Sequence, residues 1–398
     1  MIVHSYYDED PRVRREAEAL VAAGREVDVI ALRRPGEPSE ATIAGVRVAR
    51  LGVQRHQGAG IGRYAAEYLD FLVRSTIALV RAHRRRRYGL VQVHTIPDLL
   101  AAAALPLRLA GVPLLVDFHE AMPEFFRSRF PAAANPVAHA LLVLQERLAV
   151  AIASEVLVVN EALEARLLAA GVPVRKVSVV RNLAALARFD PAAHPVRAFM
   201  ADGTLRLVYA GALTPTYEVD VAVEAVALIR ERRPELALVF DIYGRGDTAP
   251  ALAALAAARG IADRVRLHGR IPLEEVPAVL AAADVGLAPT RRDAFTDVSL
   301  STKIFEYAAM GKPVVATRLP MVEATCPPGS VLAYEPGDAA AMAAAILSLV
   351  DEPEARAARV GRTLALARER SWEAEAPRYL AVVDRLMSGP GRPVSSSG

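Results

Sequence analysis

The chain has 398 residues and a net charge of +3, and its length suits two domains of ordinary size rather than one small core. Hydrophobic residues make up 53% of the sequence, yet no apolar run reaches the ~18 residues that a transmembrane helix needs, and the acidic segment 8–10 argues against a signal peptide. The single cysteine, Cys326, excludes an internal disulfide and a cysteine-based metal cage, which favours a cytoplasmic protein.

The first half of the chain alternates short apolar runs with segments of helical periodicity. A helix is predicted from Asp10-Pro11 to Gly24, a pair of extended segments turns at Gly45, and a flexible joint is expected at Gly58–Gly62. Strands are predicted at 2–4, 27–32, 90–94, 114–117, 155–159 and 177–180, and helices at about 63–83, 98–110, 135–153 and 161–170. This alternation predicts a doubly wound parallel sheet, and the first strand-to-helix turn lacks the glycines of a dinucleotide fingerprint.

Four consecutive arginines, Arg84–Arg87, end the predicted long helix. Such a run is most often a solvated helix end, where the positive charge also interacts favourably with the helix dipole. The alternative is attraction to an anionic membrane surface, which would place the protein peripherally at the inner membrane face.

Two predicted strands end next to a histidine and an acid. His94 precedes Asp98, while His119 and Glu120 follow the strand at 114–117, with Glu124 a turn later. Ligands bind at this edge of doubly wound sheets, although a single histidine in a loop is more often structural than catalytic. These residues are therefore candidates for a site in the first domain.

The alternation lapses near residues 183–204 and then restarts. This lapse predicts a first domain at 1–190, a linker at 191–204 and a second doubly wound domain at 205–370. An amphipathic helix at 371–387 follows, and the Gly-, Pro- and Ser-rich tail at 388–398 is expected to be disordered.

Three loops of the second domain carry glycines directly after a predicted strand. They begin at Gly211, at Gly244-Arg245 and at Gly269-Arg270-Ile271. Glycine lets the backbone approach a ligand closely, although any tight strand-to-helix turn has the same composition. We expect main-chain contacts to a ligand from Arg270 and Ile271.

Residues 284–317 carry the densest chemistry in the sequence. A buried strand at 284–289 and a polar loop precede a helix that should begin at Ser301 and Thr302. Unpaired N–H groups and Lys303 in the first turn favour an anion, while Glu306 on the same face suits the two hydroxyls of a ribose. Taken alone, the lysine and the glutamate are more often a solvated surface pair. Their context instead predicts half of a nucleotide-sugar site.

This segment resembles the donor-site signature of retaining GT-B-fold glycosyltransferases of family 4, in the branch associated with polysaccharide and glycoconjugate assembly. Glu306 matches the later glutamate of the signature Glu-x7-Glu, and residues 311–315, Gly-Lys-Pro-Val-Val, match the segment that follows. The place of the earlier glutamate, which touches the donor sugar in the family, holds Val298. Asp297 and Asp293 are the nearby acids that could substitute for it.

The resemblance implies a GT-B architecture: two Rossmann-like domains with a cleft between them and a C-terminal helix that crosses back. It implies transfer of a sugar from a nucleoside diphosphate-sugar to a saccharide, lipid-linked or small-molecule acceptor, with retention of configuration. The family neutralises the diphosphate with an Arg and a Lys in the first loop of the second domain, and here those places hold Ala212 and Tyr217.

The resemblance also assigns residues. The catalytic set is His119, Lys303 and Glu306, and the acceptor side is Asp10, Arg12, His94, Glu120 and Glu124. The donor-binding set is Gly211, Gly244, Arg245, Arg270, Ile271, Arg291, Asp297, Ser301, Thr302, Lys303 and Glu306. No metal, other cofactor or nucleic acid is expected, because the lysine and the helix dipole take the place of a cation at the phosphates.

Two other functions remain open at this point. One is a nucleotide-sugar epimerase or hydrolase on the same architecture, which would need an acid–base set around the sugar. The other is a non-catalytic nucleotide-sugar-binding partner of another transferase, which the replaced family residues at 212, 217 and 298 motivate.

Overall fold

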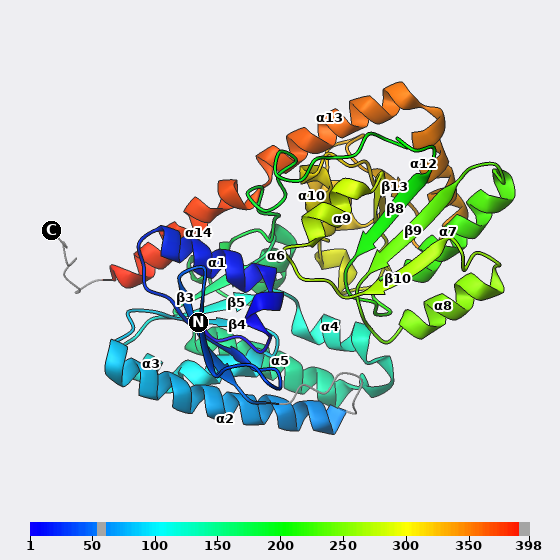
Figure 1. The fold of residues 1–398 in the computed structure, drawn as a ribbon. Helices are drawn as coiled ribbons and strands as arrows, with labels where there is room; N and C mark the ends of the chain where they lie inside the picture. Colours follow the sequence, from blue (N-terminus) through cyan, green and yellow to red (C-terminus); the bar gives the residue numbers. More distant parts are fainter. Residues whose placement is uncertain (54–60, 390–398) are drawn as a thin grey trace. The chain divides into compact units, whose positions relative to one another are not determined.

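The computed structural model describes residues 1–53 and 61–389. The chain forms two compact units, of which the second is Leu183–Ala374 and the first is made of the residues on either side of it (Figure 1). Most of the predicted joint at 58–62 and of the predicted tail at 388–398 lies outside the described residues.

The first unit is built on a mostly parallel sheet. Ile2 bridges its two halves, because it pairs in parallel with both Ile30 and Val93, and only the short hairpin strand β2 runs antiparallel. The strand order is β2-β3-β1 on one side and β4-β5-β6-β7 on the other. The strands are β1 (Asp28–Leu32), β2 (Glu40–Ile43), β3 (Val46–Leu51), β4 (Val91–His94), β5 (Leu114–Phe118), β6 (Glu155–Val158) and β7 (Val177–Val179).

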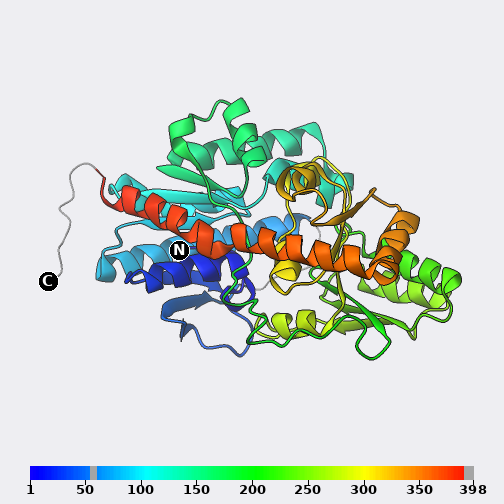
Figure 2. The same ribbon diagram turned by 90° about the horizontal axis from the view of Figure 1, so that it is seen from above.

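Helices cover both faces of this sheet, and β4, β5 and β6 are accordingly buried along their whole length. Figures 1 and 2 show α1 and α14 on one face and α2 and α5 on the other. The helical elements are η1 (Tyr7–Glu9), α1 (Pro11–Ala22), α2 (Ile61–Arg86), η2 (Asp98–Ala104), α3 (Leu105–Leu109), α4 (Met122–Arg129), η3 (Pro131–Ala133), α5 (Pro136–Ile152), α6 (Glu161–Ala169), η4 (Val174–Lys176) and α14 (Trp372–Met387). The helix predicted at 98–110 is thus a 3-10 segment followed by one short α-helix.

The second unit is an all-parallel sheet with the order β10-β9-β8-β11-β12-β13. The order reverses between β8 and β11, and in doubly wound sheets such a reversal marks the place where ligands bind. The strands are β8 (Leu205–Ala210), β9 (Leu238–Tyr243), β10 (Val265–Gly269), β11 (Val285–Ala288), β12 (Val314–Thr317) and β13 (Leu332–Tyr334). The helices are α7 (Val219–Arg232), α8 (Ala249–Ala258), α9 (Val276–Ala282), η5 (Thr296–Val298), α10 (Lys303–Ala309), α11 (Pro320–Thr325), α12 (Ala339–Asp351) and α13 (Pro353–Glu369).

The boundary between the units falls after Asn182, earlier than the predicted boundary at 190. Leu183, Ala184 and Phe189 are buried in a core cluster of the second unit, so this segment belongs to that unit rather than to the end of the first domain. Phe199, within the segment predicted as a linker, also packs against the second unit's core. Proline and polar residues near 190 had suggested an exposed connection, but the apolar side chains between them are anchored.

Helix α14 begins in one unit and continues in the other. The Trp372 N–H donates to the Ala184 carbonyl in the second unit, whereas the residues from Glu375 onward belong to the first. Tyr379, Val382 and Val383 are buried there. None of the described helices is long and apolar enough to cross a membrane.

Candidate functional site

Backbone hydrogen bonds join three loops at the carboxyl edge of the second sheet. The Gly211 N–H donates to the Tyr243 carbonyl at 2.8 Å, and the Gly244 N–H donates to the Gly269 carbonyl at 2.7 Å. The Leu213 N–H donates to the Arg245 carbonyl at 3.0 Å. The ends of β8, β9 and β10 therefore form one connected surface next to the point where the strand order reverses.

Glycine is required at two of these positions because other groups fill the space of a side chain. A Cβ atom on Gly211 would lie 2.2 Å from the Cε atom of Lys303, and one on Gly244 would lie 1.8 Å from the Gly211 carbonyl oxygen. The sequence predicted that these glycines make room for a ligand. The structure shows that they make room for a lysine and for a neighbouring loop.

Lys303 lies at the first position of α10 and is buried. Its Nζ atom is 4.1 Å from the ring centroid of Tyr217 and 5.4 Å from that of Tyr209, and both are cation–π contacts. No carboxylate among the described residues forms an ion pair with it. A buried cation without an acidic partner favours an anionic ligand.

Tyr307 fixes the position of α10 on the sheet. Its hydroxyl donates to the Leu287 carbonyl at 3.1 Å and accepts from the Ala210 N–H at 3.3 Å. A Cβ atom on Gly286 would lie 2.3 Å from this ring, so the helix packs directly on β11. Lys303 and Glu306 consequently stand at fixed positions beside the ends of β8 and β11, with Glu306 half-buried.

Helix α10 begins one to two residues later than predicted. Thr302 is its N-cap residue, but the Thr302 side chain makes no capping hydrogen bond, and Ser301 precedes the helix. Both residues are half-buried beside Lys303.

The loop between β11 and α10 assigns different positions to the two candidate acids. The Asp293 carboxylate accepts hydrogen bonds from the N–H groups of Phe295 and Thr296 at 2.9 and 3.0 Å, so it holds a turn. Asp297 pairs with Arg292 at 3.2 Å. The Arg291 N–H donates to the Thr216 carbonyl at 2.8 Å, which joins this loop to the loop after β8.

The remaining donor-side candidates lie on the same edge but do not converge on Lys303. Arg245 and Arg270 are exposed on the loops after β9 and β10, and Ile271 is half-buried. Lys312, in the matched Gly-Lys-Pro-Val-Val segment, is buried and donates to the carbonyls of Ala281 and Ala283. Burial lowers the pKa of Lys312 to about 8, and its contacts give it a structural role.

One surface cavity of the second unit lies away from this edge. Its volume is about 580 Å³, and it is lined by residues of the segment 193–206 and of α9, near the starts of β8 and β11. None of the residues predicted for donor binding lines it.

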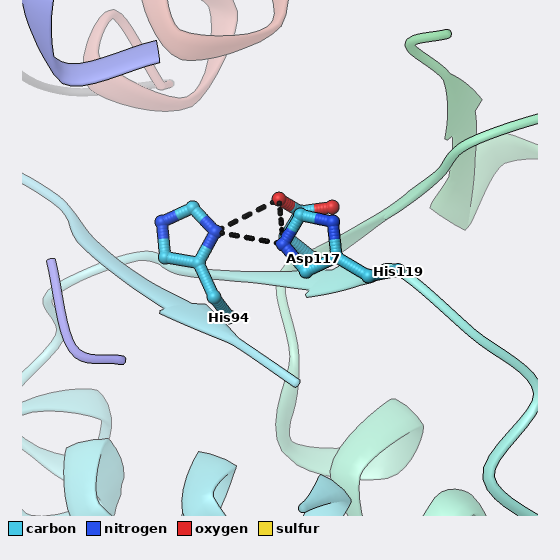
Figure 3. Close-up of side chains that lie close together, drawn as sticks. All are labelled: His94, Asp117 and His119. Carbon is cyan, nitrogen blue, oxygen red and sulfur yellow. Dashed lines mark hydrogen bonds and ion pairs between the residues drawn. The ribbon is translucent and has the colours of Figure 1, made fainter. Parts of the chain in front are cut away.

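In the first unit, His94, Asp117 and His119 meet at the ends of β4 and β5 (Figure 3). An Asp117 carboxylate oxygen lies 2.9 Å from His94 Nδ1 and 3.1 Å from His119 Nε2, and those two nitrogens are 3.2 Å apart. The two rings are stacked, and all three side chains are buried. The sequence predicted both histidines but not the carboxylate that holds them.

Burial sets the protonation of this cluster. It lowers the pKa of His94 to about 4 and that of His119 well below its usual value, so both imidazoles are neutral at physiological pH. Burial also raises the pKa of Asp117 to about 7. Among the described residues these three form a group that could hold a metal ion, since their ligand atoms lie within 4.8 Å of one another.

A chain of buried polar groups runs from this cluster to α14. Asp117 is hydrogen-bonded to Glu16, which accepts from Gln92 Nε2 at 2.6 Å. The Tyr379 hydroxyl donates to Gln92 Oε1 at 2.7 Å. Sequence analysis missed Glu16 and Gln92, because a buried polar residue on a helix or strand is visible only once its partners are known.

We expect this chain to make stability depend on pH. Burial and the nearby Asp117 raise the pKa of Glu16 to about 8, so the folded protein binds a proton more tightly than the unfolded chain. That stabilisation is fully present below the unfolded pKa of about 4.3 and is lost as pH rises through about 8. The unfolding temperature should therefore fall between weakly acidic and alkaline pH, and Glu16→Gln should flatten the fall. Calorimetry over a pH series tests this, with Glu18→Gln on the same helix as control; an unchanged slope in Glu16→Gln would contradict it.

The other acceptor-side candidates have separate partners. Asp10 caps α1 by accepting from the N–H groups of Arg12 and Val13; burial opposes its ionisation, but Arg12 outweighs burial and holds the pKa of Asp10 below its usual range. Glu124 pairs with Arg166 at 2.8 Å, on α6, and so does not join the histidines. Glu120 is half-buried, and burial raises its pKa.

Comparison with protein families matches nearly the whole chain to glycosyltransferases. Residues 10–183 match the model described as "Glycosyl transferase 4-like domain", and residues 204–352 match "Glycosyl transferases group 1". The D-inositol 3-phosphate glycosyltransferase of Thermobispora bispora is 31% identical over 298 residues, which cover 71% of this chain and 68% of that protein. The alpha-D-kanosaminyltransferase of Streptomyces kanamyceticus is 28% identical over 309 residues, covering 74% and 76%.

Solved structures share the fold over nearly the full length. Sucrose-phosphate synthase of Thermosynechococcus elongatus superposes with a TM-score of 0.77 at 19% identity, covering 97% of this chain and 98% of that one. HepE of Anabaena, solved with UDP and glucose, gives a TM-score of 0.70 at 16% identity, covering 96% and 98%.

Proposed function

This chain belongs to the family 4 glycosyltransferases of GT-B fold, and we propose from that membership that it moves a sugar from a nucleoside diphosphate-sugar to an acceptor hydroxyl with retention of anomeric configuration. The family assignment makes the chain a glycosyltransferase that uses a nucleotide-sugar donor. Retention, the base, the sugar and the acceptor belong to the proposal.

The observation that carries the proposed donor site is the buried ammonium group of Lys303. It lies over Gly211, between two tyrosine rings, and has no acidic partner among the described residues. A diphosphate placed against Gly211 would supply the missing negative charge. In our proposal Lys303 neutralises the diphosphate in place of the family arginine and lysine, whose positions hold Ala212 and Tyr217.

Tyr217 has a different role from the family lysine at its position. Its ring lies against Lys303 Nζ and leaves the ammonium no room to turn away from Gly211. The tyrosine therefore contributes orientation rather than charge. The exposed side chains of Arg245 and Arg291 are the further cations on this edge that we propose for the donor.

Glu306 is proposed to bind the ribose. It lies one helical turn beyond Lys303, so the two side chains project from the same face of α10. A carboxylate accepts hydrogen bonds from two vicinal hydroxyls, and each charge-assisted bond adds specificity. Ser301 and Thr302 precede this turn and are proposed to contact the phosphates through their N–H groups.

Replacing Glu306 with alanine should lower the affinity for a ribonucleoside diphosphate by about 10- to 100-fold, because hydrogen bonds to a charged group contribute roughly 1.5–3 kcal/mol. The variant should no longer distinguish this ligand from its 2′,3′-dideoxy analogue. Calorimetric titration measures both effects, with Glu323→Ala on α11 as control. Full affinity in Glu306→Ala would show that the ribose assignment is wrong.

The first unit is proposed to supply His119 and the acceptor side. A neutral imidazole held by Asp117 can exchange hydrogen bonds with a sugar hydroxyl without adding charge. The departing phosphate is proposed to assist attack on the same face of the sugar, so no protein nucleophile is assigned. Asp10, Arg12, His94 and Glu120 lie around His119 or pair with its neighbours and are the proposed acceptor-side groups.

The transfer is proposed to need no metal ion. Lys303 supplies positive charge at the phosphates, and the donors and acceptors of the histidine cluster are already paired with one another. A chelator should therefore leave the initial rate within about twofold, since no metal-bound group would be removed. Loss of activity with chelator and its return on adding Zn²⁺ would instead assign a metal to His94, Asp117 and His119.

Product analysis tests the function itself. A panel of nucleoside diphosphate-sugars is incubated with and without candidate acceptors, and the anomeric configuration of the product is determined by NMR. We expect transfer that depends on the acceptor, with retained configuration. Free sugar or an epimerised donor formed without acceptor would favour the hydrolase or epimerase alternative. Donor binding without any turnover would favour the non-catalytic partner, the alternative suggested by Ala212 and Tyr217.

A further inference from the structure

The first unit exposes an unusual amount of apolar surface on one group of helices. Twelve large hydrophobic side chains are exposed among the described residues, and ten of them lie on α2, η2, α3 and α5. The segment η2 contacts both α2 and α5, so these elements adjoin one another, and Figure 1 shows them on the same face of the sheet. The ten are Leu69, Val73, Ile77, Leu99, Leu105, Leu109, Val137, Leu141, Leu144 and Leu148, and we call them the apolar face.

The spacing of these residues shows continuous stripes rather than scattered exposure. On α5, Val137, Leu141, Leu144 and Leu148 recur at helical intervals and are between 50% and 70% exposed. On α2, the side chains at 69, 73 and 77 are between 45% and 57% exposed. Single exposed hydrophobic residues are ordinary on a protein surface, whereas a contiguous set marks a surface that binds a partner.

The charged residues around the apolar face have one sign. Seven arginines on α2 and α5 are exposed, namely Arg63, Arg74, Arg81, Arg84, Arg85, Arg86 and Arg147. The acids of the same elements are withdrawn: Glu67, Asp98 and Glu146 are buried, and Asp70 is half-buried and paired with Arg74. Arg84 lies seven residues after Ile77, so it continues the apolar stripe of α2 with positive charge.

We propose that the apolar face, with the arginines that border it, docks this protein on the surface of an anionic lipid bilayer. Helices with an apolar side and arginines beside it lie in the plane of the membrane, where the side chains enter the headgroup boundary and the cations meet anionic lipids. A second copy of this chain fits less well, because a two-fold contact would bring the same arginines against one another. The inference does not depend on the proposed sugar transfer, because binding to lipid is measured without substrate.

Flotation of the full-length protein with lipid vesicles tests the proposal. One set of vesicles contains phosphatidylcholine alone, and in the other phosphatidylglycerol replaces part of it. We expect at least tenfold more protein to float with the anionic vesicles, and the difference to shrink at high salt. Equal flotation with both vesicles, or none with either, would overturn the proposal.

Two variants separate the apolar and the charged contributions. The triple variant Leu141→Glu, Leu144→Glu, Leu148→Glu and the double variant Arg84→Glu, Arg85→Glu should each lower flotation with anionic vesicles at least tenfold. Val196→Glu, at an exposed valine of the second unit, is the matched control and should float like the parent. All these positions are exposed, and an unchanged unfolding temperature verifies folding. If the triple variant floats normally but turns a dimeric parent into a monomer in sedimentation, the face joins two copies and the lipid proposal is wrong.

Discussion

Replacing Lys303 with methionine is expected to lower kcat/KM for the nucleotide-sugar by about 10³-fold. This loss is in the range seen when one cation or donor that stabilises a transferring or leaving group is removed. Methionine has a similar length and can keep the contacts with Tyr217 and Tyr209, so the change chiefly removes charge. Arginine should not rescue the activity, because the space over Gly211 is already filled by the end of the lysine.

The control for this experiment is Lys176→Met, at a lysine of η4 in the first unit. It should keep the parent's kcat/KM, and both variants should unfold within a few degrees of the parent. Activity of Lys303→Met within threefold of the parent would remove Lys303 from the account. Steady-state kinetics at several donor concentrations are sufficient to decide.

Replacing His119 with alanine is the second large expected effect. We expect kcat to fall by about 10²- to 10³-fold while the affinity for the nucleoside diphosphate stays within about twofold, since the proposed diphosphate and ribose contacts lie in the second unit. Because burial holds the pKa of His119 well below 6.5, the parent should keep its activity through pH 6 instead of losing it near that value. Kinetics and calorimetry on the same preparation separate turnover from binding.

His194→Ala, in the second unit, is the matched control for His119→Ala and should retain parental kcat. Asp117→Asn should lie between the parent and His119→Ala, because it keeps the shape of the cluster but changes the hydrogen bonds that orient the imidazole. Equal loss of donor affinity and of kcat in His119→Ala would contradict a role confined to the transferred sugar.

The fold could be predicted because both sheets alternate strands and helices in the sequence. The apolar runs at 114–117 and 285–288 coincide with buried parallel strands, and the lapse after residue 183 separates two restarts of the same pattern. The boundary itself was misplaced. Whether Leu183 and Phe189 pack into the second unit depends on contacts with residues far along the chain, which local composition does not contain.

The candidate site was predictable only where neighbours in sequence are neighbours in space. Lys303 and Glu306 share a helix turn, so their spacing indicated a shared face. Tyr379 was assigned to the apolar side of its helix, and it is buried, but its hydroxyl donates to Gln92 across 287 residues of sequence. Periodicity reports that a side chain is inside; it does not report which polar group meets it there.

The account as a whole depends on Lys303 gripping a diphosphate. The most direct test is calorimetric titration of the parent and of Lys303→Met with a nucleoside diphosphate and with the corresponding nucleoside. We expect the parent to bind the diphosphate at least 100-fold more tightly than the nucleoside, and this preference to fall at least tenfold in the variant while nucleoside binding stays the same. An equal preference for the diphosphate in both proteins would contradict the account.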